Sequence, residues 1–275
     1  MKPLSFKDFD QRYQAVVGEV IGHWTPEMQT LLATHSFGWH PSRFDFDSYL
    51  RASSIRFYKA YLGFAQDENR RAVCDVGGFW GTFSIMLADL GYEVTMTESL
   101  RYYGGAFDGL FEFIASRGVQ VLDYDPFEPD ISAPNRFDVV TVMAVLEHYP
   151  HSLKCFMQNV TGLLKPDGMI YLEVPNIAYL PRRIRFLLGN SPLSTIEEIF
   201  HSEVPFIGHH HEFTIAELRD LARLSGLTIL KENYFNYSIR AQPLLKRILS
   251  HIVGFSSFVL LRDSRECLAV LCTLK

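Results

Sequence analysis

The sequence predicts an α/β fold, in which a largely parallel sheet is flanked by helices. Three observations support this prediction. A strand, a glycine-rich turn, a helix and a second strand follow one another between Ala72 and Glu98, which is the order of a βαβ unit. Short apolar strands and helical segments then alternate along the rest of the chain. A length of 275 residues with 48% hydrophobic residues allows one large domain with a substantial core.

The first 70 residues precede the βαβ unit, and we expect them to form a helical cap, distinct from a main domain over residues 71–275. The helical segments expected here are Asp8–Val20, Pro26–Ala33 and Phe44–Phe64. The second helix opens with Thr25 as a cap and Pro26 in its first turn. Such a cap is expected to lie over the cleft of the main domain. Arg56 and Tyr58 are candidate ligand contacts, with core or surface roles as the alternative.

The βαβ unit has the features that hold a nucleoside. Its elements are a strand over Ala72–Val76, a glycine turn over Gly77–Gly81, a helix over Thr82–Leu90 and a strand over Tyr92–Thr97. Glycines let the backbone approach a ligand without Cβ collisions. The start of the helix offers free N–H groups and the positive end of its dipole. Glu98 closes the second strand, where a carboxylate accepts both ribose hydroxyls.

The remaining elements complete an alternating pattern. In order, we expect a helix over Gly104–Arg117, strands over Val119–Leu122 and Arg136–Met143, a helix over His151–Leu164, a strand over Met169–Val174, helices over Leu180–Leu188, Leu193–His201 and Ile215–Leu224, a strand over Thr228–Tyr234, a helix over Pro243–Val253 and a strand over Glu266–Thr273. The near-continuous apolar run before Met143 is typical of a strand buried on both faces. The LKPDG segment at 164–168 predicts a helix stop and a tight turn.

These motifs, taken in order, resemble those of the class I S-adenosylmethionine (SAM) methyltransferases. Asp75, Gly77 and Gly81 match the family pattern D-x-G-x-G-x-G, and Phe79 replaces its middle glycine. We expect the neighbouring Gly78 to supply the missing backbone freedom. The segments FDVV, VLEHYP and LKPDG match later family motifs. The resemblance implies a Rossmann-like seven-stranded sheet, with the last strand antiparallel between the fifth and sixth, and an insertion over 175–212 that forms part of the substrate cleft.

The resemblance also implies SAM as the cofactor and a set of residues around it. These are Asp75, Gly77, Gly78, Gly81, Glu98, Asp123, Asp125, Ala144 and Glu147. An acid after the third strand accepts from the adenine amino group in this family. Asp125 is favoured over Asp123 for that role, and the other acid is expected to cap a turn. Glu147 is expected near the methionine moiety or the substrate.

The implied reaction moves the sulfonium methyl group to a nucleophile, so the protein must position the acceptor and remove its proton. Histidine suits a hydroxyl acceptor near neutral pH. The candidates are His209 and His211, which precede a helix with the capping box Thr214–Glu217, and His148, for which a structural role is the alternative. We expect one of the two late histidines to be the base. The resemblance implies O-methylation of a small-molecule, sugar-linked or lipid-linked acceptor.

Two more functions remain open. Relatives that methylate RNA ribose or quinone precursors carry E-x-x-E-H and bind a divalent ion there. Ala144 stands at the first acid, so we predict no metal, although Glu147, His148 and two late histidines are the alternative ligand set. The net charge of -5 argues against a nucleic-acid partner. The third function is a non-catalytic scaffold subunit, suggested by Phe79 in the glycine turn.

The sequence predicts a cytoplasmic protein and leaves its oligomeric state open. We find no signal-peptide pattern and no apolar run of the roughly 20 residues that span a bilayer. The four cysteines lack paired spacing, which predicts reduced thiols. Arg182, Arg183 and Arg185 alternate with apolar residues. We expect a solvated basic face packed on the core, and contact with an anionic substrate or a membrane surface through these three arginines is the alternative.

Overall fold

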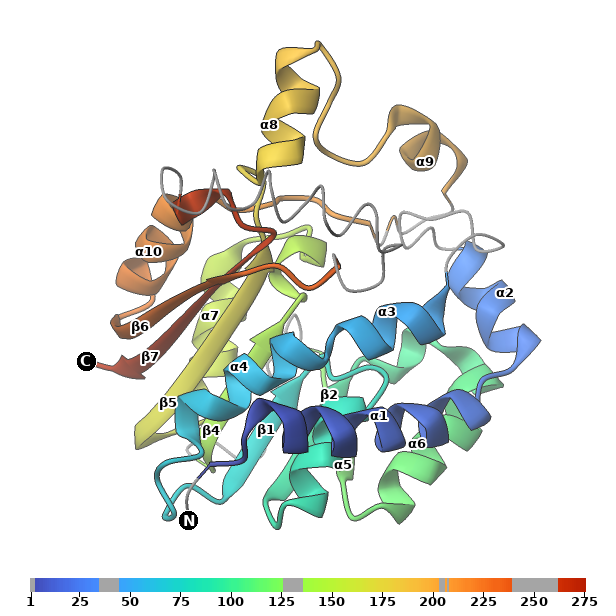
Figure 1. Ribbon diagram of the computed structural model, residues 1–275, viewed down its shortest axis with the longest axis vertical. Helices are drawn as coiled ribbons and strands as arrows, with labels where there is room; N and C mark the ends of the chain where they lie inside the picture. Colours follow the sequence, from blue (N-terminus) through green and yellow to red (C-terminus); the bar gives the residue numbers. More distant parts are fainter. Residues whose placement is uncertain (1–2, 35–44, 126–135, 203–205, 207, 239–261) are drawn as a thin grey trace.

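The structure is a computed structural model that describes residues 3–34, 45–125, 136–202, 206, 208–238 and 262–275. The described residues form one seven-stranded sheet in the order β3-β2-β1-β4-β5-β7-β6, with helices on both faces (Figure 1). The first five strands pair in parallel. Strand β7 pairs antiparallel with both β5 and β6. The predicted fold class is therefore confirmed, including the antiparallel last strand between the fifth and sixth.

The central strands are buried on both faces, as their apolar sequences predict. The strands are β1 Ala72–Val76, β2 Glu93–Glu98, β3 Gln120–Asp123, β4 Phe137–Met143, β5 Leu164–Pro175, β6 Leu227–Phe235 and β7 Cys267–Leu274. Cysteines 74, 267 and 272 are buried in β1 and β7, and all four cysteines are unpaired. This arrangement confirms the predicted free thiols.

Helices cover the sheet in two layers. They are α1 Phe6–Gly22, α2 Pro26–Thr34, α3 Phe46–Ala52, α4 Ser54–Phe64, α5 Thr82–Asp89, α6 Asp108–Ser116, α7 Leu153–Gly162, α8 Leu180–Leu187, α9 Ile196–His201 and α10 Ile215–Leu224. Short 3-10 helices are η2 Leu100–Tyr102, η3 Gly104–Phe107, η4 Leu146–His148 and η6 Arg262–Ser264. One core joins α1, α4, α5 and α6 to the sheet, and a second joins α7 and α10 to its other face. Helices α8 and α9 stand apart from both layers (Figure 1).

The N-terminal helices are anchored to the sheet by Trp80, an aromatic residue of the glycine turn. Trp80 is buried, with its ring 4.6 Å from that of Trp24 on the loop after α1 and 5.0 Å from that of Phe46 on α3. The Tyr13 hydroxyl donates to the Leu50 carbonyl at 2.9 Å and so ties α1 to α3. The cap therefore shares one hydrophobic core with the sheet.

Three predicted elements differ in detail. The helical stretch up to Phe64 breaks at Ser53 into α3 and α4. The helix expected from Gly104 begins as a 3-10 turn and becomes α-helical only at Asp108. The sequence predicts a turn over 164–168 before a strand that starts at Met169. That strand start is wrong, because β5 already begins at Leu164. Its register against β4 shifts there, so extra residues bulge out of β5 while pairing resumes beyond them.

One predicted helix and the question of a membrane-spanning helix depend on which residues the structure describes. The helix predicted over Pro243–Val253 lies outside the described residues. Within the part of the chain that is described, none of the helices has the length and apolar character needed to cross a bilayer.

Candidate functional site

The turn between β1 and α5 lies at the carboxyl end of the sheet and depends on two glycines. Gly77 and Gly81 have φ angles of 67° and 66°, which glycine adopts without strain. A Cβ on Gly77 would lie 2.6 Å from Val145 Cγ2, and one on Gly81 would lie 2.6 Å from Ile114 Cδ1. Gly81 precedes α5 and makes no side-chain cap, so the first N–H groups of the helix are not taken by a capping side chain of that residue and can be offered to a ligand.

Gly78 is required for a different reason from the one expected. It is not among the glycines with positive φ, so the expectation that it supplies the missing backbone freedom is wrong. A Cβ there would lie 2.6 Å from Met96 Cγ and 2.7 Å from Asp75 Oδ2. Asp75 is itself buried and accepts from the hydroxyls of Ser84 and Thr141, each at 2.7 Å. Burial raises its pKa to about 6. Asp75 therefore supports the turn from beneath.

Glu98, at the end of β2, closes against the same turn. Its Oε1 accepts from the Phe79 N–H at 2.6 Å, and its Oε2 accepts from the Tyr103 hydroxyl at 2.9 Å. The Phe79 and Tyr103 rings stack, with centroids 5.1 Å apart. Burial raises the Glu98 pKa to about 7. The acid lies where the sequence predicts, and Tyr103 holds one of the oxygens that would accept from ribose. Sequence reasoning missed Tyr103, because no motif marks it.

The two acids after β3 both hold the segment that follows Glu98. Asp123 Oδ1 accepts from the Leu100 N–H at 3.0 Å, which is the turn-capping role expected for one of them. Asp125 Oδ2 accepts from the Ser99 hydroxyl at 3.2 Å and forms an ion pair with Arg101. The predicted contact of Asp125 with adenine stays a prediction.

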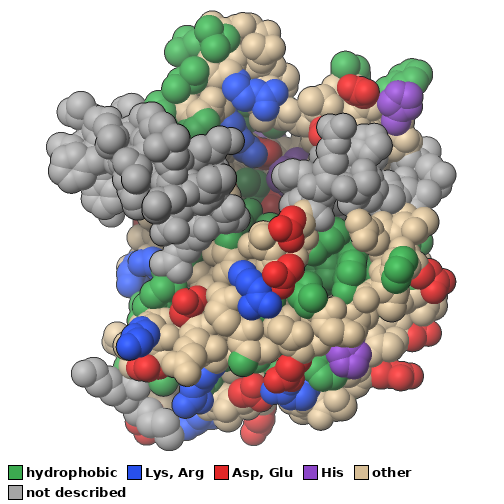
Figure 2. All heavy atoms as spheres, turned by 45° about the vertical axis from the view of Figure 1, so that its right-hand side comes forward, with side chains coloured by type: hydrophobic (Ala, Val, Ile, Leu, Met, Phe, Trp, Pro, Cys, Tyr) green, Lys and Arg blue, Asp and Glu red, His purple; other side chains and the backbone are tan. Residues whose placement is uncertain are grey.

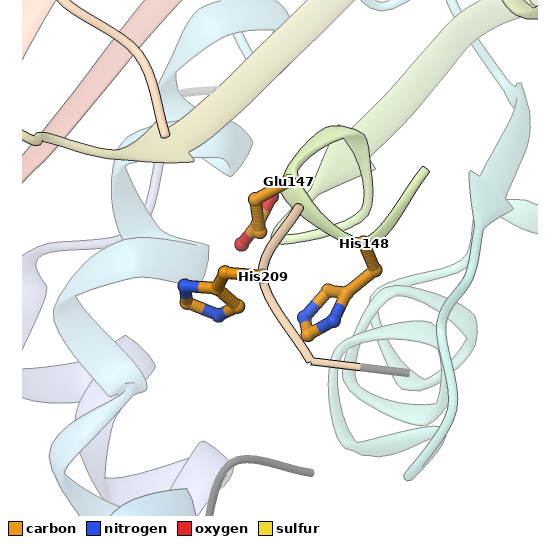
Figure 3. A group of neighbouring side chains, drawn as sticks. All are labelled: Glu147, His148 and His209. Atoms are coloured by element: carbon orange, nitrogen blue, oxygen red, sulfur yellow. The ribbon is translucent and has the colours of Figure 1, made fainter. Parts of the chain in front are cut away.

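A second group of polar side chains meets beyond β4. Glu147 and His148 come from η4, and His209 comes from the loop before α10; Figure 3 shows the three side chains pointing toward one another. One ligand-type atom of each lies within 4.8 Å of the other two. The His210 N–H donates to the Glu147 carbonyl at 2.7 Å, which fixes the loop against η4. This long-range contact brings together two of the three predicted histidines.

Glu212 sets the hydrogen-bonding state of His209. The His209 Nδ1 lies 2.7 Å from Glu212 Oε1, and buried Glu212 also forms an ion pair with Arg182. An ionised carboxylate only accepts, so Nδ1 carries the proton and Nε2 keeps its lone pair. Burial, and then the nearby His148, lower the His209 pKa to about 3. The ring is therefore neutral at pH 7 with Nε2 able to accept a proton, and burial makes it a weaker base than a solvated histidine until Glu212 pairs with the imidazolium that forms.

The remaining late histidines lie elsewhere. His211 is half exposed and its Nε2 lies 3.4 Å from Glu217 Oε1, at the start of α10. His210 Nε2 lies 3.0 Å from the Phe206 carbonyl. Both rings line a separate hollow of about 330 Å³, beside Tyr149. Of the two late candidates, the structure therefore brings His209 to Glu147 and His148 and does not bring His211.

A buried ion pair lies beneath this group. Arg56 on α4 donates to Glu173 Oε2 on β5 at 2.5 Å, and its guanidinium lies 4.9 Å from the Tyr237 ring centroid. Glu147 is buried nearby, and among the described residues its Oε2 has no hydrogen-bond partner. Burial raises the Glu147 pKa to about 8, and the charge of Glu173 adds to this. Arg56, a candidate ligand contact from the sequence, is buried and paired with Glu173.

Ala144 lies between the glycine turn and the Glu147–His148–His209 group, and its backbone conformation is unusual. Its φ of 55° is unusual for a residue with a side chain, and such strain clusters at functional sites. Its N–H donates to the Glu173 carbonyl at 3.0 Å. The chain thus turns sharply out of β4, which places Val145 over Gly77 and Glu147 toward His209. The hydroxyl of Tyr58, the other ligand-contact candidate of the cap, donates to the Leu4 carbonyl at 3.1 Å.

The arrangement fits an adenosyl cofactor. The glycine turn, the start of α5 and Glu98 lie together at the carboxyl end of the central strands. The Phe79 N–H in the turn donates to Glu98, which joins these parts. Open α/β sheets bind nucleotides in the crevice outside the carboxyl ends of their strands. Glu98 would hold the ribose and the turn would face the methionine part, with the Glu147–His148–His209 group beyond it. The Tyr103 hydroxyl already donates to Glu98 Oε2, one of the oxygens that a ribose hydroxyl would use.

Comparison with known proteins agrees with this arrangement. A family model described as a methyltransferase domain matches residues 46–232, more than half of the chain. Comparison with curated protein sequences found no match. Among solved structures, a SAM-dependent methyltransferase from Archaeoglobus fulgidus is 16% identical with a TM-score of 0.52, covering 82% of this chain and 93% of that one.

Two further solved structures show the same fold. Magnesium protoporphyrin IX methyltransferase from Synechocystis PCC 6803, with bound SAH, is 14% identical with a TM-score of 0.54, covering 85% of this chain and 89% of that one. A putative sarcosine dimethylglycine methyltransferase from Galdieria sulphuraria is 13% identical with a TM-score of 0.52, covering 83% and 89%. The chain belongs to the methyltransferase-domain family, and it is a class I SAM-dependent methyltransferase whose cofactor is S-adenosylmethionine.

Proposed function

We propose that the protein transfers the methyl group of SAM to a hydroxyl oxygen, and that His209 takes the proton of that hydroxyl. The observation that carries this proposal is the chain of contacts from Arg182 through Glu212 to His209 Nδ1. It leaves a neutral ring with a free acceptor nitrogen beside Glu147 and His148. A base oriented by a carboxylate is a recurring arrangement for removing a proton from a hydroxyl.

Each residue has a part in this reaction. SAM supplies an electrophilic methyl group when bound. His209 accepts the acceptor's proton at Nε2 as the new bond to carbon forms, and Glu212 stabilises the resulting imidazolium. Glu147, which its raised pKa keeps largely protonated near pH 7, donates a hydrogen bond to the acceptor. The Arg56–Glu173 pair acts on Glu147 through its charges, since Glu173 raises the Glu147 pKa and Arg56 lowers it.

A lipid-linked or sugar-linked acceptor suits the surroundings. The insertion that carries α8 connects to the base through Arg182, and both of its helices expose large apolar side chains. An acceptor with an apolar carrier would therefore meet apolar surface beside the polar group that reacts. The cytoplasmic location expected from the sequence stays a prediction.

The proposal is tested with a pair of histidine variants. His209→Asn removes the base and is expected to lower kcat by about 100-fold or more. His211→Asn is the matched control, since it removes a ring of the same loop that contacts Glu217 instead. Turnover is followed as SAH formation with a panel of hydroxyl acceptors, and SAH affinity is measured by calorimetry. Equal loss in both variants, or no loss in His209→Asn, would contradict the role of His209.

A metal-assisted reaction is the second candidate, because Glu147, His148 and His209 have the ligand types and closeness of a divalent-cation site. A bound cation would lower the pKa of the acceptor hydroxyl and make a separate base unnecessary. His209 cannot serve both as ligand and as base. Titration of the purified protein with Mn²⁺ or Zn²⁺ separates the two mechanisms, and saturable binding lost in His209→Asn would favour the metal.

Methylation of RNA and a scaffold role without catalysis have weaker support. RNA as the acceptor of a metal-assisted reaction conflicts with the net charge of -5, since RNA affinity depends on neutralising phosphates. The scaffold role was suggested by Phe79 in the glycine turn. In the structure the Phe79 N–H donates to Glu98 and its ring packs on Tyr103, which is compatible with a working turn.

A further inference from the structure

Helices α8 and α9 present an unusual apolar surface. Neither helix has a buried residue. Their most exposed large side chains are Phe186 (69%), Leu187 (83%), Leu188 (72%), Ile196 (80%) and Phe200 (79%). Large apolar side chains exposed together on the end of a helix mark a binding site for a protein or a membrane, and here they occur on two neighbouring projections (Figure 1 and Figure 2). We call these five side chains the α8–α9 apolar tip.

The projecting shape of this region favours a lipid bilayer over a folded protein as the partner. Figure 1 shows α8 and α9 projecting beyond the body of the molecule, and Figure 2 shows hydrophobic side chains on the outside of both projections. Phe186, Leu187 and Leu188 are consecutive at the outer end of α8. A projecting tip would need a matching hollow on a folded protein, whereas the interfacial region of a bilayer accepts such side chains without one.

The charges beside the tip indicate which kind of bilayer. Helix α8 carries three arginines and no acid. Arg182 is turned inward to Glu212, so Arg183 and Arg185 are the two arginines of this helix that we consider for contact with a membrane. Arg185 is exposed, and Arg183 is partly exposed with its Nε–H donating to the Ala178 carbonyl. Helix α9 contributes Glu197, Glu198 and His201, with Glu198 engaged in the capping box of Thr195.

We propose that the α8–α9 apolar tip docks on the surface of a bilayer containing anionic lipid, with Arg183 and Arg185 facing the headgroups. The tip enters the headgroup region, and the arginines next to it pair with lipid phosphates. Arg182, one turn from the docked residues, reaches inward through Glu212 to His209. The base therefore lies close to the membrane surface, where the headgroup of a lipid-linked acceptor is presented. Docking itself requires neither cofactor nor catalysis, so it is separable from the proposed function.

The test is flotation of the whole protein with vesicles of phosphatidylcholine alone, or mixed with an equal amount of phosphatidylglycerol. We expect binding to the mixed vesicles that weakens with added salt. The double variant Phe186→Ser, Leu187→Ser is expected to weaken partitioning about tenfold or more. Leu224→Ser is the matched control, since Leu224 on α10 is equally exposed (73%) and should leave binding unchanged. Arg185→Glu should weaken binding to the mixed vesicles alone.

Three results would overturn this inference. One is a wild-type protein that binds neither kind of vesicle. Another is a double variant that binds as the wild type does. The third is a dimer in sedimentation that the double variant dissolves, without any vesicle binding, which would assign the tip to a second copy of the chain. Circular dichroism and SAH affinity, unchanged in all variants, show that each variant is folded and that any failure concerns the membrane and not the methyl-transfer site.

Discussion

Replacing Tyr103 with phenylalanine should strengthen cofactor binding. In the structure the Tyr103 hydroxyl donates to Glu98 Oε2 at 2.9 Å, and the Phe79 N–H takes the other oxygen at 2.6 Å. Because Glu98 is buried and each of its oxygens already accepts one hydrogen bond, we expect a ribose hydroxyl to take the place of Tyr103 on Oε2, so binding costs the protein one hydrogen bond before it gains one. Tyr103→Phe removes that competition, while its ring can still stack on Phe79.

The size of the effect follows from the bond that is lost. A buried hydrogen bond to a carboxylate contributes about 1.5–3 kcal/mol. The cofactor-free protein should lose about this much unfolding free energy in Tyr103→Phe, whereas the bound protein loses little. The SAH dissociation constant should therefore fall by about 10- to 100-fold, because 1.4 kcal/mol corresponds to about tenfold.

Calorimetric titration with SAH and urea unfolding without ligand measure the two effects. Tyr234→Phe is the matched control, because that hydroxyl also donates to a carboxylate, Glu232, at 2.6 Å but lies on β6. It should leave SAH affinity unchanged. Unchanged or weaker SAH binding by Tyr103→Phe would refute the reasoning and would show that Tyr103 supports the bound cofactor.

Three further predictions concern the buried acids. Because burial raises the Glu98 pKa from 4.5 to about 7, the folded cofactor-free protein binds more protons than the unfolded chain in this window; its unfolding free energy should fall as pH rises from 4.5 to 7, and Glu98→Gln should flatten this slope in urea titrations. Glu173→Ala leaves Arg56 buried without its partner and should cost about 3–5 kcal/mol of unfolding free energy, and a loss below 1 kcal/mol would contradict the pairing. Glu212→Gln no longer fixes the proton on His209 Nδ1 and should lower kcat about tenfold or more, with SAH affinity unchanged as the check that only the base is affected.

The fold could be predicted because its signals are local. The glycine turn after β1, the acid that ends β2 and the buried run of β4 each follow from a short stretch of sequence. Their order along the chain then gives the sheet. What local patterns did not give is the path through LKPDG, where pairing with β4 resumes after a bulge and keeps β5 continuous. Strand pairing is a long-range interaction that turn residues alone do not decide.

The site was only partly predictable for the same reason. The late histidines are adjacent in sequence, and long-range contacts decide that His209 faces inward: the His210 N–H donates to the Glu147 carbonyl, and Glu212 holds the His209 ring. Tyr103 follows Glu98 without any motif, and its role depends on where η2 and η3 bring the hydroxyl. In α8 the periodicity indicates an amphipathic helix, but it does not show that Arg182 turns to a buried carboxylate.

The most direct test of the account is a crystal structure of the protein with SAH. We predict that the ribose hydroxyls lie within hydrogen-bonding distance of Glu98, that the Tyr103 hydroxyl has left it, and that the sulfur faces His209 instead of His211. A nucleoside bound away from the Gly77–Gly81 turn, or a Glu98 that still accepts from Tyr103 with SAH in place, would contradict the account.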